Sequence, residues 1–308
     1  MWGGACRLEE KYFAMIAPLL SSYLDESSDK EQKQTLCVGG LLISQRSLDK
    51  IQGAWIERLA TAEIAYFSFT DCKGLHGEFL PYRAKYKSEA RNMADSVLAD
   101  LESILLSGSW IGFGLAVLIA DYERVLAEIP VSSVFYEKDP TELAYGQIMC
   151  DIARAVRKEA PNHAVAYFVD ESSDYPKIAH GFRAIKSNHP IIGKTMMTVA
   201  ALDDKGVPAL QMADLIVGVV RESIVAWLKS GNRYSTLDDK WRVRFEKGIA
   251  RWDGEHTMKN LKATLRSHKF ISGTIANRLL PKPSASQKRR QEKLRRKSLV
   301  EARIKDGI

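Results

Sequence analysis

Apolar runs that suit buried strands alternate along most of this chain with segments of helical spacing. The clearest strand candidates are 35–43 and 110–120, which are continuous apolar runs with β-branched residues. Segments 47–65, 85–106 and 208–228 carry apolar side chains at helical intervals. An interleaved order of strands and helices predicts an α/β sheet with helices on its faces.

Shorter apolar segments complete the expected sheet. A strand at 21–24 precedes the one at 35–43 closely enough to pair with it as a hairpin, so we expect antiparallel edges and a mixed sheet. Further short strands are predicted at 66–70, 164–169 and 195–202. The chain beyond this sheet divides into a helical extension at 231–281 and a basic tail at 282–308.

The positive charge of the chain is concentrated in that tail. The whole chain carries a net charge of +7 at pH 7, and residues 282–308 alone contain ten Lys or Arg and three acidic residues. The tail is too charged to bury, so we expect an exposed helix or a disordered arm. One interpretation is that the tail only keeps the protein soluble. The other is that it binds nucleic-acid phosphates. Its candidate nucleic-acid-binding residues are Lys288, Arg289, Arg290, Lys293, Arg295, Arg296 and Lys297.

The remaining composition predicts a cytoplasmic protein. The longest apolar run, 110–120, is too short to span a bilayer. Charged residues from Arg7 onward interrupt the N-terminus, which lacks the unbroken apolar stretch of a signal peptide. The 4 cysteines form no C-x-x-C pair and indicate reduced thiols. We therefore expect no membrane partner and no zinc site.

One acidic motif occurs twice. The sequence Y-L-D-E-S-S-D at 23–29 returns as F-V-D-E-S-S-D at 168–174, and in both copies an apolar strand runs directly into two carboxylates. Ligands bind at strand ends in α/β sheets. The alternative is a pair of polar turns, since Asp and Ser favour such positions. The repetition favours a site that contains Asp25, Glu26, Asp170 and Glu171.

A third carboxylate interrupts an apolar helix. Asp214 lies within L-Q-M-A-D-L-I-V-G at 210–218, where a lone charge is unfavourable without a partner. Gly218, four residues later on the same face, leaves space beside it. The alternative to a ligand site is a buried salt bridge to Arg221, Lys194 or Arg183.

Carboxylates from two strand ends and a helix suit Mg²⁺ or Mn²⁺, which prefer oxygen ligands. Two such ions can activate water and stabilise the leaving oxygen in phosphodiester cleavage. The chain contains no P-loop, no G-x-S-x-G and no H-E-x-x-H motif, which argues against those catalytic classes.

A weaker cluster occupies 71–78. Glu78 is a candidate metal ligand, His76 a candidate for proton transfer and Lys73 a candidate for phosphate contact. The alternative is an exposed polar loop.

These motifs together resemble the domain-of-unknown-function 3800 family. The resemblance rests on Y-L-D-E-S, the middle K-x-x-H-x-E, F-V-D-E-S and L-Q-M-A-D-L-I-V-G, and it covers residues 20–230. It implies a ribonuclease H-like fold with Asp25 on the central first strand, Asp170 on the fourth strand and Asp214 on the closing helix. It also implies metal-dependent nuclease chemistry, and members are associated with mobile elements or antiphage defence.

We therefore predict a ribonuclease H-like catalytic domain at 1–230 that hydrolyses nucleic-acid phosphodiesters with Mg²⁺ or Mn²⁺. Its expected metal ligands are Asp25, Asp170, Asp214 and Glu78. The expected partner is DNA or RNA, together with a protein partner in a defence system. The alternative is a non-catalytic member of the same fold that binds nucleic acid or protein.

Overall fold

The computed structural model describes residues 19–28, 34–128, 139–230, 237–245 and 250–251. The chain divides into two compact units, 1–252 and 253–308, and every described residue belongs to the first. The basic tail and most of the expected extension at 231–281 therefore lie outside the described residues.

Six strands form one mixed sheet in the order β5-β4-β1-β2-β3-β6. β1 runs antiparallel to β2, and β2 antiparallel to β3, whereas β4 is parallel to β1 and β5 is parallel to β4. The strands are β1 (Leu19–Ser28), β2 (Thr35–Ser44), β3 (Trp110–Leu118), β4 (Ala164–Asp170), β5 (Met196–Leu202) and β6 (Ala250–Arg251). The predicted mixed sheet is confirmed, and β1 lies inside it between β4 and β2, in the position that the family resemblance implies for the first strand.

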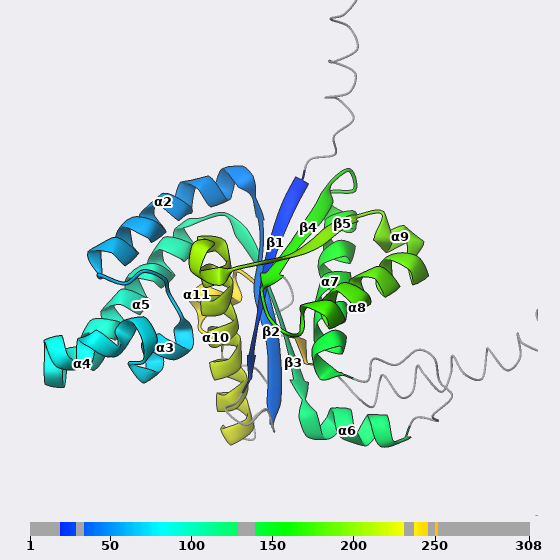
Figure 1. Cartoon of the computed structure of the whole chain (residues 1–308). Helices are drawn as coiled ribbons and strands as arrows, with labels where there is room; N and C mark the ends of the chain where they lie inside the picture. The colour runs from blue at the N-terminus through cyan, green and yellow to red at the C-terminus, as the bar shows by residue number, and fades with distance from the viewer. Residues whose placement is uncertain (1–18, 29–33, 129–138, 231–236, 246–249, 252–308) are drawn as a thin grey trace, which may run out of the picture. The chain divides into compact units, whose positions relative to one another are not determined.

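Helices cover both faces of the sheet (Figure 1). On one side lie α2 (Gln45–Thr61), α3 (Phe69–Gly74), α4 (Leu80–Tyr86), α5 (Ala90–Ser107), α10 (Pro208–Ser230) and α11 (Asp239–Arg242). On the other lie α7 (Pro140–Glu159), α8 (Tyr175–Asn188) and α9 (Pro190–Gly193), while α6 (Ile119–Glu128) follows β3. Short 3-10 turns occur at η1 (Gly77–Phe79), η2 (Lys87–Glu89) and η3 (Asp204–Gly206). The interleaved sequence thus forms the predicted three layers, with α10 packed directly on β1 and β2.

The connection between β2 and β3 is a helical insertion. The two strands are sheet neighbours, yet α2 to α5 separate them in sequence. The strand predicted at 66–70 is wrong, because Ser68 caps α3 by accepting a hydrogen bond from the Asp71 N–H. The aromatic residues of this segment are buried in the core without joining the sheet: Phe67 is 0% exposed and Phe69 1%.

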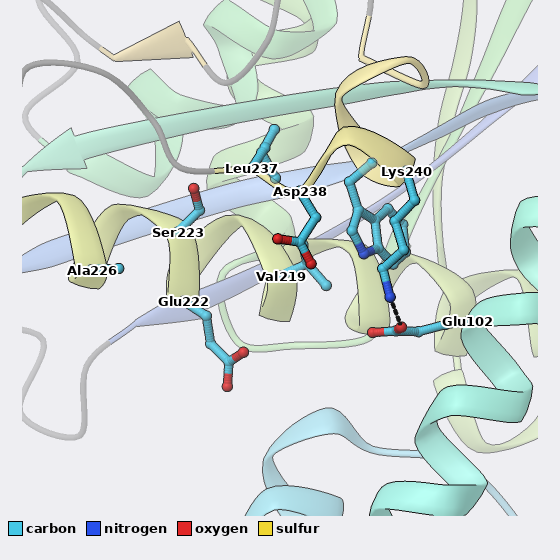
Figure 2. A pocket seen from close by; sticks show the side chains of 9 residues that line it. Glu102, Val219, Glu222, Ser223, Ala226, Leu237, Asp238 and Lys240 are labelled. Atoms are coloured by element: carbon cyan, nitrogen blue, oxygen red, sulfur yellow. Dashed lines mark hydrogen bonds and ion pairs between the residues drawn. The ribbon is translucent and has the colours of Figure 1, made fainter.

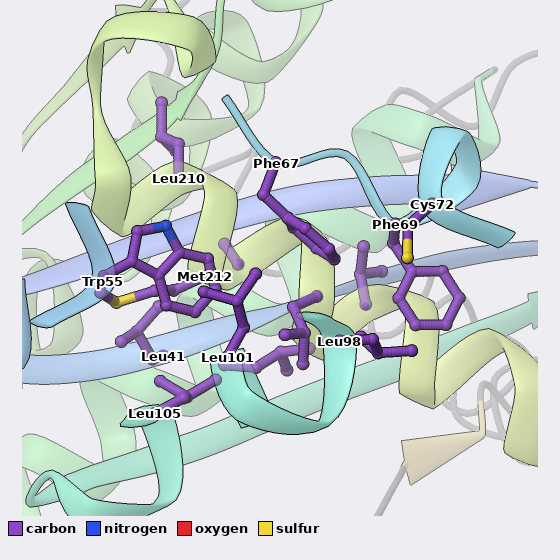
Figure 3. Packing of buried hydrophobic residues seen from close by; sticks show 14 of the residues in the cluster. Leu41, Trp55, Phe67, Phe69, Cys72, Leu98, Leu101, Leu105, Leu210 and Met212 are labelled. Carbon is purple, nitrogen blue, oxygen red and sulfur yellow. The ribbon is translucent and has the colours of Figure 1, made fainter. Parts of the chain in front are cut away.

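The main core lies between the sheet, α10 and this insertion. Trp55 meets Phe67 edge-on at 5.9 Å between ring centroids, and Phe67 meets Phe79 at 6.3 Å. Figure 3 shows the rings of Trp55 and Phe67 packed with leucines of α5 and with Met212 of α10. The predicted helical spacing of 47–65 is confirmed, since Leu48, Ile51, Trp55 and Leu59 are its buried residues.

The described cysteines, Cys37, Cys72 and Cys150, are buried. Among the helices of the described ranges, none combines the length and apolarity needed to cross a membrane.

Candidate functional site

Two acidic strand ends lie side by side in the sheet. The parallel register of β1 and β4 pairs Tyr23 with Phe168, whose rings stack with centroids 5.1 Å apart. Two positions further along, β1 reaches Asp25 and β4 reaches Asp170. The structure therefore brings the aspartates of the repeated motif to the same end of the sheet.

Neighbouring acids of β1 face opposite sides, because side chains alternate along a strand. Tyr23 belongs to the buried cluster beneath α10, so Asp25 faces α10 and Glu26 faces α7. On the α7 side, the hydroxyl of Tyr145 donates a hydrogen bond to Oε2 of Glu26. Asp170 lies two residues after Phe168 on β4, so both side chains point to the same side of the sheet. Phe168 packs against the hydrophobic core beneath α10, and Asp170 therefore lies on the same side as Asp25.

Asp214 reaches this end of the sheet from α10. It is half-buried, and its Oδ2 accepts a hydrogen bond of 2.7 Å from the backbone N–H of Phe69. Within the described residues, Asp214 forms no ion pair with Arg221, Lys194 or Arg183. Arg221 instead donates to Oγ of Ser27 at 3.0 Å. Asp214 therefore makes no direct salt bridge to these three residues in this part of the chain, although the charge of Arg221 still acts on it.

The electrostatics of Asp25 reflect its crowded surroundings. Burial raises the pKa of Asp25 well above its usual range, and the charges of Asp214 and Glu26 raise it further, followed by that of Asp170. The backbone N–H of Glu26 donates to Oδ1 of Asp25 at 2.8 Å and lowers this pKa. The charges of three acids thus act on Asp25. We call the four carboxylates of Asp25, Glu26, Asp170 and Asp214 the acidic cluster.

Asp214 is perturbed by its neighbours in the same sense. Burial raises the pKa of Asp214 to about 6, although the hydrogen bond from Phe69 lowers it. The negative charge of Asp204 raises this pKa, the guanidinium of Arg221 lowers it, and the charge of Asp71 raises it. Burial also raises the pKa of Glu26, against the hydrogen bond from Tyr145.

Asp204 is an additional acid that the sequence motifs do not indicate. It lies in η3, and burial followed by the charge of Asp170 raises its pKa. A signal was present, because β5 also runs directly from Leu202 into Asp203 and Asp204. Tyr145 was missed for a different reason, since one tyrosine in an amphipathic helix carries no distinguishing pattern.

The chemistry of the acidic cluster fits a hard divalent cation, because its donors are all carboxylate oxygens. Asp25, Asp170 and Asp214 would be the ligands. Across the part of the chain that the structure describes, no three His, Cys, Asp or Glu side chains form a group arranged to hold a metal ion. Carboxylates without a counterion repel one another, so a bound cation would have to draw them together.

The other predicted site residues make contacts of their own. Oε2 of Glu78 accepts a hydrogen bond of 2.6 Å from the backbone N–H of Ala65. His76 is exposed at the start of η1, and Glu171 is exposed directly after β4. None of these three residues is among the charges that shift the pKa of Asp25 or of Asp214. Lys73 lies close to Phe69, with its Nζ 5.4 Å from the ring centroid.

Gln211 connects three segments around Asp214. Its Oε1 accepts hydrogen bonds from Trp55 Nε1 at 3.1 Å and from the Phe67 N–H at 3.2 Å. Its Nε2 lies 3.1 and 3.2 Å from the carbonyl oxygens of Asp204 and Lys205. Gln211 is only 2% exposed, so all of its polar atoms are satisfied inside the protein.

We expect Gln211→Ala to lower the free energy of unfolding by about 2–4 kcal/mol, because it leaves buried donors and acceptors unpaired. Urea unfolding followed by circular dichroism measures this. Gln45→Ala is the control, since the Gln45 side chain donates an exposed hydrogen bond to Asp49. Equal stability of the two variants would show that the Gln211 contacts contribute little.

A cavity of about 220 Å³ lies beside α10, next to α11 and α5 (Figure 2). Lys240 on its wall pairs with Glu102 at 2.6 Å, and Glu222 on its wall pairs with Lys73 at 3.4 Å. Its lining also includes the buried Trp241. Two of the acids of this cavity are therefore already engaged by lysines.

The seven basic residues predicted to bind nucleic acid, Lys288, Arg289, Arg290, Lys293, Arg295, Arg296 and Lys297, lie outside the described residues.

No family model and no curated protein matches the chain. A similar solved structure is described as the crystal structure of Bst-RNase HIII in complex with Mn²⁺, with 13% sequence identity and a TM-score of 0.36. The similarity covers 71% of this chain and 57% of that one. A likeness of this strength supports no conclusion about activity, so the fold class rests on the strand order and register described above.

Proposed function

We propose that the protein is a divalent-metal-dependent nuclease whose ligands are Asp25, Asp170 and Asp214. The observation that carries the proposal is the surroundings of Asp25. Its side chain is half-buried among like charges, and within the described residues it forms no ion pair with a lysine or arginine. Such an arrangement is unfavourable unless a cation joins it.

The protein's own backbone would orient two of these ligands. The Glu26 N–H binds Oδ1 of Asp25, and the Phe69 N–H binds Oδ2 of Asp214. Both hydrogen bonds favour the ionised carboxylate, which is the form that ligates a metal. When bound, Mg²⁺ or Mn²⁺ supplies an activated water and stabilises negative charge on the phosphate oxygens.

The other predicted residues would act around this centre. Glu26 is held by Tyr145 and contributes charge from the opposite face of β1. Glu78, Glu171 and His76 remain candidates for completing the site, although Glu78 is engaged by Ala65. The motif resemblance supports membership of the domain-of-unknown-function 3800 family and a role in antiphage defence or mobile-element biology as further parts of the proposal.

A nuclease assay tests the proposal directly. Single- and double-stranded DNA and RNA are incubated with the purified protein in Mg²⁺ or Mn²⁺, with and without EDTA. We expect cleavage that EDTA abolishes and that excess Mn²⁺ restores. If all substrates stay intact under every condition, the non-catalytic binding protein becomes the better interpretation.

A further inference from the structure

One aromatic side chain packs directly beside Asp214. Asp214, Gly218 and Arg221 are spaced along one face of α10. A Cβ atom placed at Gly218 would lie 2.3 Å from Cγ of Phe69, so the Phe69 ring occupies the space that this glycine leaves. The backbone N–H of Phe69 donates a hydrogen bond to Asp214. Phe69 therefore fixes the helical insertion onto α10 at the acidic cluster.

Two cations lie against this ring. Cζ of Arg221 is 5.9 Å from the Phe69 centroid, and Nζ of Lys73 is 5.4 Å from it. Arg221 comes from α10 and Lys73 from the insertion, so separate parts of the chain deliver them to one place. Lysines and arginines are favourably placed on the face of an aromatic ring.

Both cations keep the capacity to bind an anion. Nη1 of Arg221 donates to Oγ of Ser27 and, at 3.4 Å, to the carbonyl oxygen of Ser28, whereas Nε and Nη2 donate to no acceptor within the described ranges. Lys73 is exposed and pairs with the exposed Glu222 at 3.4 Å, an interaction that is weak in water. By contrast, Lys177 near the other side of the sheet is held by both Asp139 and Asp174, at 2.7 and 2.6 Å.

We propose that Arg221 and Lys73 form a binding site for a backbone phosphate of the nucleic-acid substrate. This site deepens the proposed function and rests on it. A polyanion that approaches the acidic cluster needs cations beside the carboxylates, because unscreened like charges would repel it. The planar guanidinium can bind two phosphate oxygens at once, while the lysine acts as a point charge.

Fluorescence anisotropy tests the site without any cleavage. Labelled single-stranded DNA and RNA of about 20 nucleotides are titrated with the full chain in EDTA, at NaCl concentrations between about 50 and 200 mM. We expect Lys73→Gln and Arg221→Gln each to weaken binding about fivefold at 0.1 M salt. Each should also flatten the slope of log Kd against log salt by about 0.7, the contribution of one single-strand phosphate contact.

The chain offers matched controls. Lys85, like Lys73, pairs with an acid and lies over an aromatic ring, at 2.8 Å from Glu63 and 5.3 Å from the centroid of Tyr86. Arg244, like Arg221, lies over a ring and donates to backbone oxygens, but it does so at Trp110, where β3 begins. Lys85→Gln and Arg244→Gln should leave Kd and slope unchanged.

The outcomes separate the two proposals. Unchanged affinity and slope in Lys73→Gln, or equal losses in the controls, would overturn the phosphate site. Lys73 is exposed, so its variant decides the matter even if Arg221→Gln fails to fold. The Lys73→Gln variant can lose affinity for the labelled DNA or RNA while the wild-type protein cleaves no nucleic acid in Mn²⁺. In that case the phosphate site stands and the nuclease proposal fails.

Discussion

Replacing Asp25 with asparagine should lower metal-dependent cleavage at least about a hundredfold, because a bound metal contributes several kcal/mol to the transition state. The same change should make the metal-free protein more stable. It removes a carboxylate whose pKa is raised by burial and by the charges of Asp214, Glu26 and Asp170. Steady-state cleavage in Mn²⁺ and thermal unfolding in EDTA measure the two effects.

This pair of opposite effects distinguishes a metal ligand from a structural acid. Asp100→Asn is the control, since Asp100 is an exposed partner of Arg58 at 2.9 Å and should affect neither measurement. Adding Asp170→Asn to Asp25→Asn should lower the rate little further, because ligands of one centre act as a unit. Full activity of Asp25→Asn, or a loss of stability in EDTA, would refute the assignment.

Most of the sheet could be predicted from the sequence because its strands are apolar on both sides. Continuous apolar runs such as 35–43 and 110–120 are typical of strands buried on both faces in a sheet covered by helices. The strand predicted at 66–70 is wrong because the aromatic residues of this segment are buried by packing against Trp55 and Phe79 and make no strand pairing. In a short apolar run, the expected burial of the side chains does not distinguish a strand of the sheet from a loop whose aromatic residues pack into the core.

The candidate site was predictable where charge interrupts apolar sequence. Asp25, Asp170 and Asp214 each follow or break an apolar element, and the parallel register of β1 and β4 brings the first two to one end of the sheet. The insertion was not predictable, because the contact between Phe69 and Gly218 joins residues far apart in the sequence. The space beside Asp214 that the glycine implied is therefore filled by a ring.

The metal-free protein should lose stability as the pH rises from 5 to 7. The pKa of Asp214 is about 6 in the folded state, against an ordinary value near 4, so the folded state binds more protons in this interval. Its stability is therefore greatest below the unfolded pKa and falls as the pH approaches 6. Asp214 alone accounts for about 1 kcal/mol between pH 5 and 7, and the raised pKa values of Asp25 and Glu26 act in the same direction.

Mn²⁺ should reverse this loss at pH 7, because it binds the ionised cluster in the folded state only. At a hundred times its Kd it would add about 2.7 kcal/mol, which corresponds to a rise in Tm of about 5–10 °C. Urea unfolding in EDTA from pH 5 to 7, followed by thermal unfolding with Mn²⁺, measures both parts. Asp214→Asn should flatten the pH dependence and weaken the Mn²⁺ effect, whereas Asp100→Asn should preserve both. A wild-type Tm that does not respond to millimolar Mn²⁺ would mean that the acidic cluster is stabilised by the protein alone, and the metal centre would have to be abandoned.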